Sequence, residues 1–200
     1  MLSVLPGTDP ELKDRFIVIG AHYDHVGLGT KRTSLGGIGQ IHNGADDNAS
    51  GSAAVLEVAE ALAGSSQLDH RRSILFVFWD AEELGLVGSK YWTAHPTIPV
   101  EAIDMALNVD MVGRLREDRL VVFGSRTGVG LRHFAVKHNT QLKRPMALDF
   151  NWDLLANSDH YPFFAKDIPV LFLHTGLHGQ YHRPGDDADL IAWSLSLIHI

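Results

Sequence analysis

Two adjacent glutamates, Glu82 and Glu83, follow an apolar run at 72–79 in the segment FWDAEELG. Carboxylates can bind a metal ion or act as a general base. Neighbouring carboxylates repel each other, and burying one without a partner is energetically costly. Acids in the first turn of a helix would explain one or two of them, but not their position at the end of a buried strand. We therefore expect other segments to bring a cation or cationic groups to this position.

Imidazole and carboxylate groups follow several other apolar runs. They are His22, Asp24 and His25, then Asp46 and Asp47, then Asp110, and finally His174, His178 and His182. A polar turn or a helix cap could account for each motif alone. Together, however, they would form a destabilising cluster of carboxylates, and two divalent cations about 3.5–4 Å apart would remove that penalty. The chain has no cysteine, and His and carboxylate ligands suit zinc, with cobalt or manganese as alternatives.

The spacing within two of these motifs indicates how the side chains divide their roles. In an extended segment His22 and Asp24 point to the same side, so the aspartate can fix the tautomer of the imidazole and raise its basicity as a ligand. Adjacent residues at a strand end point in different directions. One of Glu82 and Glu83 can therefore bind a metal while the other takes a proton from a bridging water.

Alternating apolar runs and helical patterns must position these side chains. Strands are predicted at 15–21, 72–79, 102–110, 119–124 and 168–175, and helices at 48–64, 83–95, 128–139 and 159–166. This alternation favours an α/β fold with three α/β/α layers and a mostly parallel central sheet. In such sheets ligands bind beyond the carboxyl ends of the strands, where the acids and histidines stand. The Gly-rich stretch at 27–44 is predicted to be a long functional or mobile loop.

Bulk properties narrow the class of protein further. Two hundred residues suggest a single domain over 1–200. The net charge of −7 argues against a nucleic-acid binder, which would show a basic face. No apolar run approaches the roughly 20 residues that span a bilayer, and no signal peptide is visible at the N-terminus. We expect the domain to be incomplete at both ends, because the C-terminal residues SLSLIHI stop mid-pattern, with no cap or polar tail.

Six segments resemble, in order and spacing, the M28 family of co-catalytic zinc metallopeptidases, which includes secreted bacterial aminopeptidases. They are AHYDHVG, GADDNASGSAAVLE, FVFWDAEELGLVGS, NVDMVG, SDHYPF and YHRPGDD. The resemblance extends from about residue 6 to residue 191. It implies a fold of the co-catalytic zinc exopeptidase type and an extracellular or periplasmic location.

The resemblance also implies two zinc ions per chain and a role for each of eight side chains. Asp47 would bridge both ions, with His22 and Asp110 on one zinc and Glu83 and His182 on the other. Glu82 would be the general base, Asp24 would orient His22, and Tyr181 would steady the tetrahedral intermediate. Asp46 is the alternative to Asp47 as the bridge.

The remaining histidines have no position left among five ligands. We expect His160 to be structural or to support a ligand, and His25, His42, His174 and His178 to be solvent-exposed or to order loops. Aromatic residues from 148–155 and 161–164 could line the side-chain pocket, although packing in the core is an equally good explanation.

The resulting expectation is a zinc aminopeptidase that acts on peptides with a free N-terminus. Two rivals share the fold: a glutaminyl cyclase with a single zinc, and a carboxypeptidase for acidic peptides that would use Arg114 or Arg116. A non-catalytic, receptor-like ectodomain is the rival from another class, but such relatives lose ligands that this chain retains.

Overall fold

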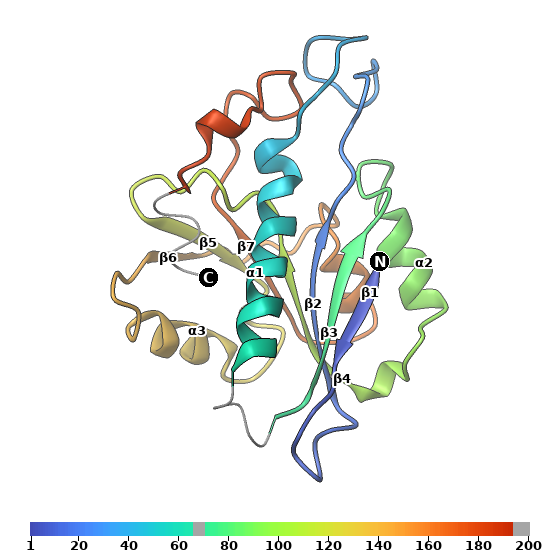
Figure 1. Cartoon of the computed structure of the whole chain (residues 1–200), viewed down its shortest axis with the longest axis vertical. Coiled ribbons are helices and arrows are strands. Elements are labelled where there is room, and N and C mark those ends of the chain that lie inside the picture. Colours follow the sequence, from blue (N-terminus) through green and yellow to red (C-terminus); the bar gives the residue numbers. More distant parts are fainter. Residues whose placement is uncertain (66–70, 194–200) are drawn as a thin grey trace.

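A seven-stranded sheet runs through the protein, in a computed structural model that describes residues 1–65 and 71–193 (Figure 1). The strand order is β1-β3-β2-β4-β7-β5-β6. The strands are β1 (Leu2–Leu5), β2 (Phe16–His22), β3 (Ser73–Trp79), β4 (Ile103–Val109), β5 (Arg119–Phe123), β6 (Ala147–Phe150) and β7 (Val170–His174). The apolar, β-branched sequences of β2, β3, β4, β5 and β7 explain why these segments form largely buried strands, whereas β1 and β6 at the two edges of the sheet are more exposed.

The directions of the strands place most of the candidate site residues at one edge. β3, β2, β4 and β7 run parallel to one another, and β6 is parallel to β5. β1 is antiparallel to β3, and β5 is antiparallel to β7. Most of the pairings are thus parallel, which confirms the prediction of a mostly parallel sheet. The carboxyl ends of β2, β3, β4 and β7 meet at the edge where β5 begins.

Helices cover both faces of this sheet, which confirms the three-layer α/β fold. The helices are α1 (Gly51–Gly64), α2 (Val87–Ala94), α3 (Leu131–Asn139) and α4 (Tyr161–Phe164), with single turns at η1 (Ala45–Ser50), η2 (Val100–Ala102) and η3 (Ala188–Leu190). Successive residues of a strand face opposite sides. Ile19 of β2 accordingly packs in a cluster with α1, whereas Val18 packs with Trp92 of α2 and Phe163 of α4. Figure 1 shows α1 lying across one face of the sheet.

Several predicted boundaries differ from the structure. The helix predicted at 83–95 begins only at Val87, because Ala81 and Leu86 adopt positive φ values of 57° and 61° and turn the chain after β3. The helices at 128–139 and 159–166 are shorter than predicted, and the strand β6 was missed. The prediction that the domain is incomplete at its C-terminal end concerns residues 192–200. Most of them lie outside the described residues. Within the described residues, no helix has the length and apolar character needed to cross a bilayer.

Candidate metal centre

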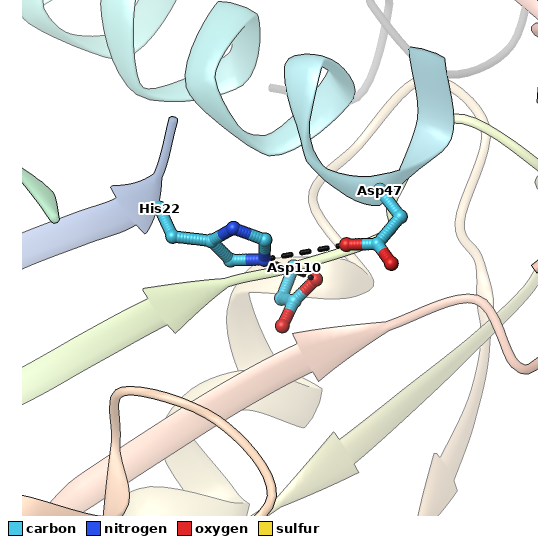
Figure 2. Close-up of side chains that lie close together, drawn as sticks. All are labelled: His22, Asp47 and Asp110. Carbon is cyan, nitrogen blue, oxygen red and sulfur yellow. Dashed lines mark ion pairs between the residues drawn. The ribbon is translucent and has the colours of Figure 1, made fainter. Parts of the chain in front are cut away.

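His22, Asp47 and Asp110 converge on one point beyond the sheet edge (Figure 2). His22 ends β2, Asp110 follows β4, and Asp47 lies in η1. The Nε2 atom of His22 is 3.3 Å from Asp47 Oδ1 and 3.4 Å from Asp110 Oδ1. All three side chains are buried. Figure 2 shows them pointing toward one another from three different segments, which is the arrangement expected of metal ligands.

Asp24 orients both His22 and the two glutamates. The Nδ1 atom of His22 donates to the backbone oxygen of Asp24 at 3.0 Å, which leaves Nε2 free to bind a metal. The Asp24 carboxylate is farther from this ring, at 3.7 Å. It accepts the backbone N–H groups of Glu82 and Glu83 at 3.0 and 3.3 Å. The expected contact was with the Asp24 side chain, whereas the hydrogen bond from His22 goes to the Asp24 backbone oxygen. Nothing in the sequence indicated that Asp24 also holds the turn after β3.

A second group of ligand types lies on the other side of Asp47. The Nε2 atom of His182 is 3.1 Å from Glu83 Oε2 and 3.2 Å from Asp47 Oδ2. Asp47 therefore offers Oδ1 to His22 and Oδ2 to His182. One carboxylate with one oxygen on each side is the geometry of a bridging ligand.

His25 also belongs to this second group, which differs from the role predicted for it. Its Nδ1 atom lies 2.8 Å from Glu83 Oε1 and 3.8 Å from Asp47 Oδ2, and its side chain is only 10% exposed. Sequence reasoning left His25 out because five ligand positions were already filled. Its spacing after His22 and Asp24 in AHYDH was the signal that could have found it.

Asp46 points away from both groups. Its Oδ1 atom accepts the N–H of Gly113 at 2.6 Å and the hydroxyl of Ser50 at 3.0 Å, and its Oδ2 atom faces His178 Nε2 at 3.2 Å. Between the two adjacent aspartates, the structure therefore places Asp47 and not Asp46 between the two groups.

The surroundings of Asp110 fit a bound divalent cation. Asp110 Oδ2 accepts the Ser158 hydroxyl at 2.7 Å, and the oxygen of that hydroxyl accepts the Asn108 side-chain amide at 2.8 Å. Asp110 Oδ1 is buried and has no hydrogen-bond partner among the described residues. A buried carboxylate oxygen without a partner is costly, and a metal ion beside His22 would satisfy it. Imidazole nitrogen and carboxylate oxygen are ligands that zinc accepts in catalytic sites.

In the metal-free chain, protons on the imidazoles neutralise the acids. Burial opposes a charge on His182, yet Asp47 and Glu83 outweigh it and raise the pKa of His182 to about 10. Burial likewise opposes a charge on His22, but neighbouring carboxylates, Asp110 first, raise its pKa well above the usual value. Burial would raise the pKa of Glu83, but hydrogen bonds from His182 and His25 lower it to about 2. A cation must therefore displace protons from these groups.

Glu82 differs sharply from its neighbour Glu83. Burial raises the pKa of Glu82 to about 9, with only partial compensation from His22. The side chain lines a cavity of about 560 Å³, together with Tyr181 and His182. A half-buried carboxyl group that faces a cavity beside the ligand groups is positioned to exchange a proton with a molecule there.

Strands β5 and β7 contribute the apolar floor of this cavity. Its apolar residues include Val121 and Phe123 of β5 and Phe172 of β7, and Leu155 adds another. The polar part of the lining includes Arg119, Asp149 and Asp153. Arg119 forms an ion pair with Asp149.

The aromatic residues expected in the pocket lie elsewhere. Phe163 is 1% exposed and packs in the core, as the alternative explanation predicted. Trp152 and Phe164 line a separate cavity of about 230 Å³. Arg114 and Arg116 do not line the larger cavity; Arg114 pairs with Asp186, and Arg116 donates to backbone oxygens of Thr175 and Leu177.

Four other histidines have structural surroundings. His160 is buried and stacks on Phe172 with ring centroids 4.7 Å apart. His42 orders the 27–44 loop through contacts with Ser34 Oγ at 2.8 Å and Gln40 O at 3.0 Å. His174 accepts Gly176 N–H at 2.6 Å, and His178 accepts Gln180 N–H at 3.2 Å. The last three histidines therefore order loops, which was one of the two roles expected for them.

Comparison with known proteins finds aminopeptidases among the similar sequences and similar folds. An aminopeptidase of Pseudomonas aeruginosa (strain UCBPP-PA14) is 35% identical in an alignment 179 residues long, which covers 82% of this chain and 29% of that protein. The LapA aminopeptidase of Legionella pneumophila has a similar structure, with a TM-score of 0.76 and 26% identity over 98% of this chain and 50% of that chain. A glutaminyl cyclase of Porphyromonas gingivalis gives a TM-score of 0.79 at 20% identity, over 98% of this chain and 72% of that chain, which shows the fold alone.

The chain spans about a third of the length of the curated relatives that it matches. A model of peptidase family M28 matches residues 2–199, and thus nearly all of the chain. Both the order of the motifs and the convergence of their side chains agree with that match. The chain therefore belongs to peptidase family M28.

Proposed function

We propose that this chain carries the catalytic centre of a zinc-dependent aminopeptidase with two zinc ions. The position of Asp47 is the single observation that supports this most, because its two oxygens face His22 and His182 separately. His22 and Asp110 would hold one ion, and Glu83 and His182 the other. Asp47 would be shared, which places two cations where the buried carboxylates need them.

When bound, the zinc pair would supply a Lewis acid and lower the pKa of a water molecule. The positive charge of the two ions would oppose the effect of burial on the pKa of Glu82, so its carboxylate would be ionised. It could then accept the proton of that water as the water oxygen attacks the first peptide carbonyl. The same carboxyl would then pass the proton to the leaving nitrogen as the C–N bond breaks. Burial raises the pKa of Tyr181, so its hydroxyl stays protonated and could donate to the developing oxyanion.

The cavity beside Glu82 would receive the N-terminal residue of a peptide. Its acids would anchor the free α-amine, and the apolar floor of Val121, Phe123 and Phe172 would contact the side chain. The aminopeptidase names of the similar proteins support this specificity. By the same resemblance, we propose extracellular or periplasmic peptides as the substrates, and the charge of −7 disfavours nucleic acid as a partner.

The rival functions have weaker support. A glutaminyl cyclase needs a single zinc, whereas Asp47 lies between two separate groups of ligand types. A carboxypeptidase for acidic peptides would need a free arginine in the cavity, but Arg119 is paired with Asp149. A non-catalytic ectodomain would have no reason to keep Glu82 buried beside the cavity.

Glu82→Gln tests the proposed base directly. Purified wild type and variant are compared for zinc content and for cleavage of an aminoacyl-anilide, with a glutaminyl cyclisation assay alongside. We expect two zinc per chain in both proteins and a loss of cleavage of roughly 10²–10⁴-fold in the variant. Full cleavage by the variant would remove Glu82 as the base, and cyclisation without cleavage would favour the cyclase.

A further inference from the structure

Asp186 makes contacts that connect the proposed metal ligands without reaching the metal positions. Its Oδ2 atom accepts the backbone N–H groups of Asp46 and Asp47 at 2.9 and 3.0 Å. Its Oδ1 atom lies 2.8 Å from Arg114 Nη2. The Asp186 side chain is fully buried and that of Arg114 is only 10% exposed. The carboxylate therefore holds the backbone of Asp47 from inside the protein.

These contacts join three ligand-bearing segments that are far apart in the sequence. Asp186 lies four residues after His182, and Arg114 lies four residues after Asp110. Two further contacts reinforce the junction: the N–H of Ala45 donates to the backbone oxygen of Asp186 at 3.0 Å, and Gly113 N–H donates to Asp46 Oδ1 at 2.6 Å. A shift at Asp186 would consequently change the distance of Asp47 from both Asp110 and His182.

A bridging ligand needs this kind of control more than a terminal one does. Each oxygen of Asp47 must meet a different ion, so a small rotation of its backbone lengthens one bond as it shortens the other. A carboxylate that accepts two backbone N–H groups and an arginine fixes that rotation, because charge-assisted hydrogen bonds are short and directional. An isolated buried carboxylate would be costly, and Arg114 compensates it.

We infer that Asp186, held by Arg114, is a positioning residue that sets the bridging carboxylate of Asp47 between the two metal ions. This rests on the proposed function, because it assigns Asp47 as the bridge. Asp187 is the natural control: it is the adjacent acid, and in the described part of the chain its carboxylate binds the side chain of Asn43 rather than the backbone of Asp47.

The test compares zinc affinity, by competition with a chelator, in the full chain carrying Asp186→Asn, Arg114→Gln, both changes, or Asp187→Asn. We expect Asp186→Asn and Arg114→Gln each to weaken zinc binding about 10- to 100-fold, and Asp187→Asn to change it less than about twofold. Because the two residues act through one contact, the zinc affinity of the double variant should be no lower than that of the single variant with the lower affinity. If Asp186→Asn does not fold without metal, the zinc affinity of Arg114→Gln tests the inference in its place.

A second readout separates positioning from stability. The absorption spectrum of the cobalt-loaded protein reports the ligand geometry, and it should change in Asp186→Asn but not in Asp187→Asn. Lower thermal stability of the metal-free variants, with unchanged zinc affinity and an unchanged cobalt spectrum, would overturn the inference. Failure of the wild type itself to bind zinc would instead contradict the proposed metal centre.

Discussion

At the scale of single residues, the two adjacent glutamates show how local surroundings separate like side chains. Glu83 faces two imidazoles and has its pKa lowered to about 2, whereas burial raises the pKa of Glu82 to about 9. The sequence predicted that the two would differ, from their position at a strand end. It could not give the direction of either change, because the change at Glu83 depends on His25 and His182 from other segments, and the change at Glu82 depends on burial in the folded chain.

His25 is expected to strengthen the binding of one ion through Glu83. Replacing His25 with Gln removes the contact between Nδ1 and Glu83 Oε1, which measures 2.8 Å. We predict about tenfold weaker retention of one zinc per chain, measured by chelator titration, and unchanged retention of the other. The exposed His95, replaced in the same way, is the control. If the His25 variant retained both ions as tightly as the wild type does, a role for this residue at the metal centre would be contradicted.

Asp159 predicts a pH dependence of the metal-free protein. Burial raises its pKa to about 7, only partly offset by the hydrogen bond from Ser89. The folded chain therefore keeps a proton on Asp159 that the unfolded chain loses near pH 4, so the contribution of Asp159 to the free energy of unfolding falls as the pH rises from about 4 to about 7. Because a tenfold difference in proton affinity corresponds to about 1.4 kcal/mol, this fall amounts to roughly 4 kcal/mol.

Asp159→Asn tests this dependence by chemical denaturation at pH 5 and pH 8. Asn is neutral at both pH values, so the free energy of unfolding of the variant, relative to that of the wild type, should be higher at pH 8 than at pH 5. A difference between the two proteins that does not change with pH would show that Asp159 is ionised in the fold throughout.

At the scale of elements, the turn after β3, and not the helix that follows it, positions the two glutamates. The pattern at 83–95 predicted a helix from the first acid, but Glu82 and Glu83 lie in a turn that ends at Gly85, whose φ is +105°. The apolar runs sufficed to predict the central strands. They could not predict the turn, because its conformation is set by Asp24 and by hydrogen bonds to backbone atoms.

Gly85→Ala is predicted to distort this turn. The added methyl group meets nothing within 4 Å, so its effect comes from the backbone conformation alone. A non-glycine residue at this φ costs on the order of 1–2 kcal/mol, and relaxation of the turn would move Glu83. We expect lower thermal stability together with weaker zinc binding. Gly64→Ala, which also enters open space but without a positive φ, should show neither effect, and equal behaviour of the two variants would contradict the account.

At the scale of the whole molecule, the layers and the mostly parallel sheet could be predicted from the alternation of apolar runs and helices. Without the resemblance to the M28 family, the site could be predicted only as a set of residue types at one sheet edge. Its finer features depend on topology: β5 runs antiparallel to β7, which leaves Val121 and Phe123 as the floor of the cavity. The strand β6 was missed because its four residues include Asp149 within a polar segment.

Zinc binding should stabilise the whole fold and release protons. His182, with a pKa of about 10, and His22, with a pKa well above its usual value, are protonated in the metal-free chain at pH 7 and must lose those protons to bind zinc. Calorimetric titration with zinc in two buffers of different ionisation enthalpy measures this release, and unfolding with and without a chelator measures the stabilisation. At a zinc concentration of about 1,000 times Kd, the gain should be roughly 4 kcal/mol. Binding without proton release would contradict protonated imidazoles.

The location of bound zinc, determined by anomalous X-ray diffraction from crystals grown with zinc, tests the central claim most directly. We predict two zinc ions per chain about 3.5–4 Å apart, with one oxygen of Asp47 on each ion. One of these ions should contact His22 and Asp110, and the other Glu83 and His182. A single ion, or two ions that do not share Asp47, would contradict the account.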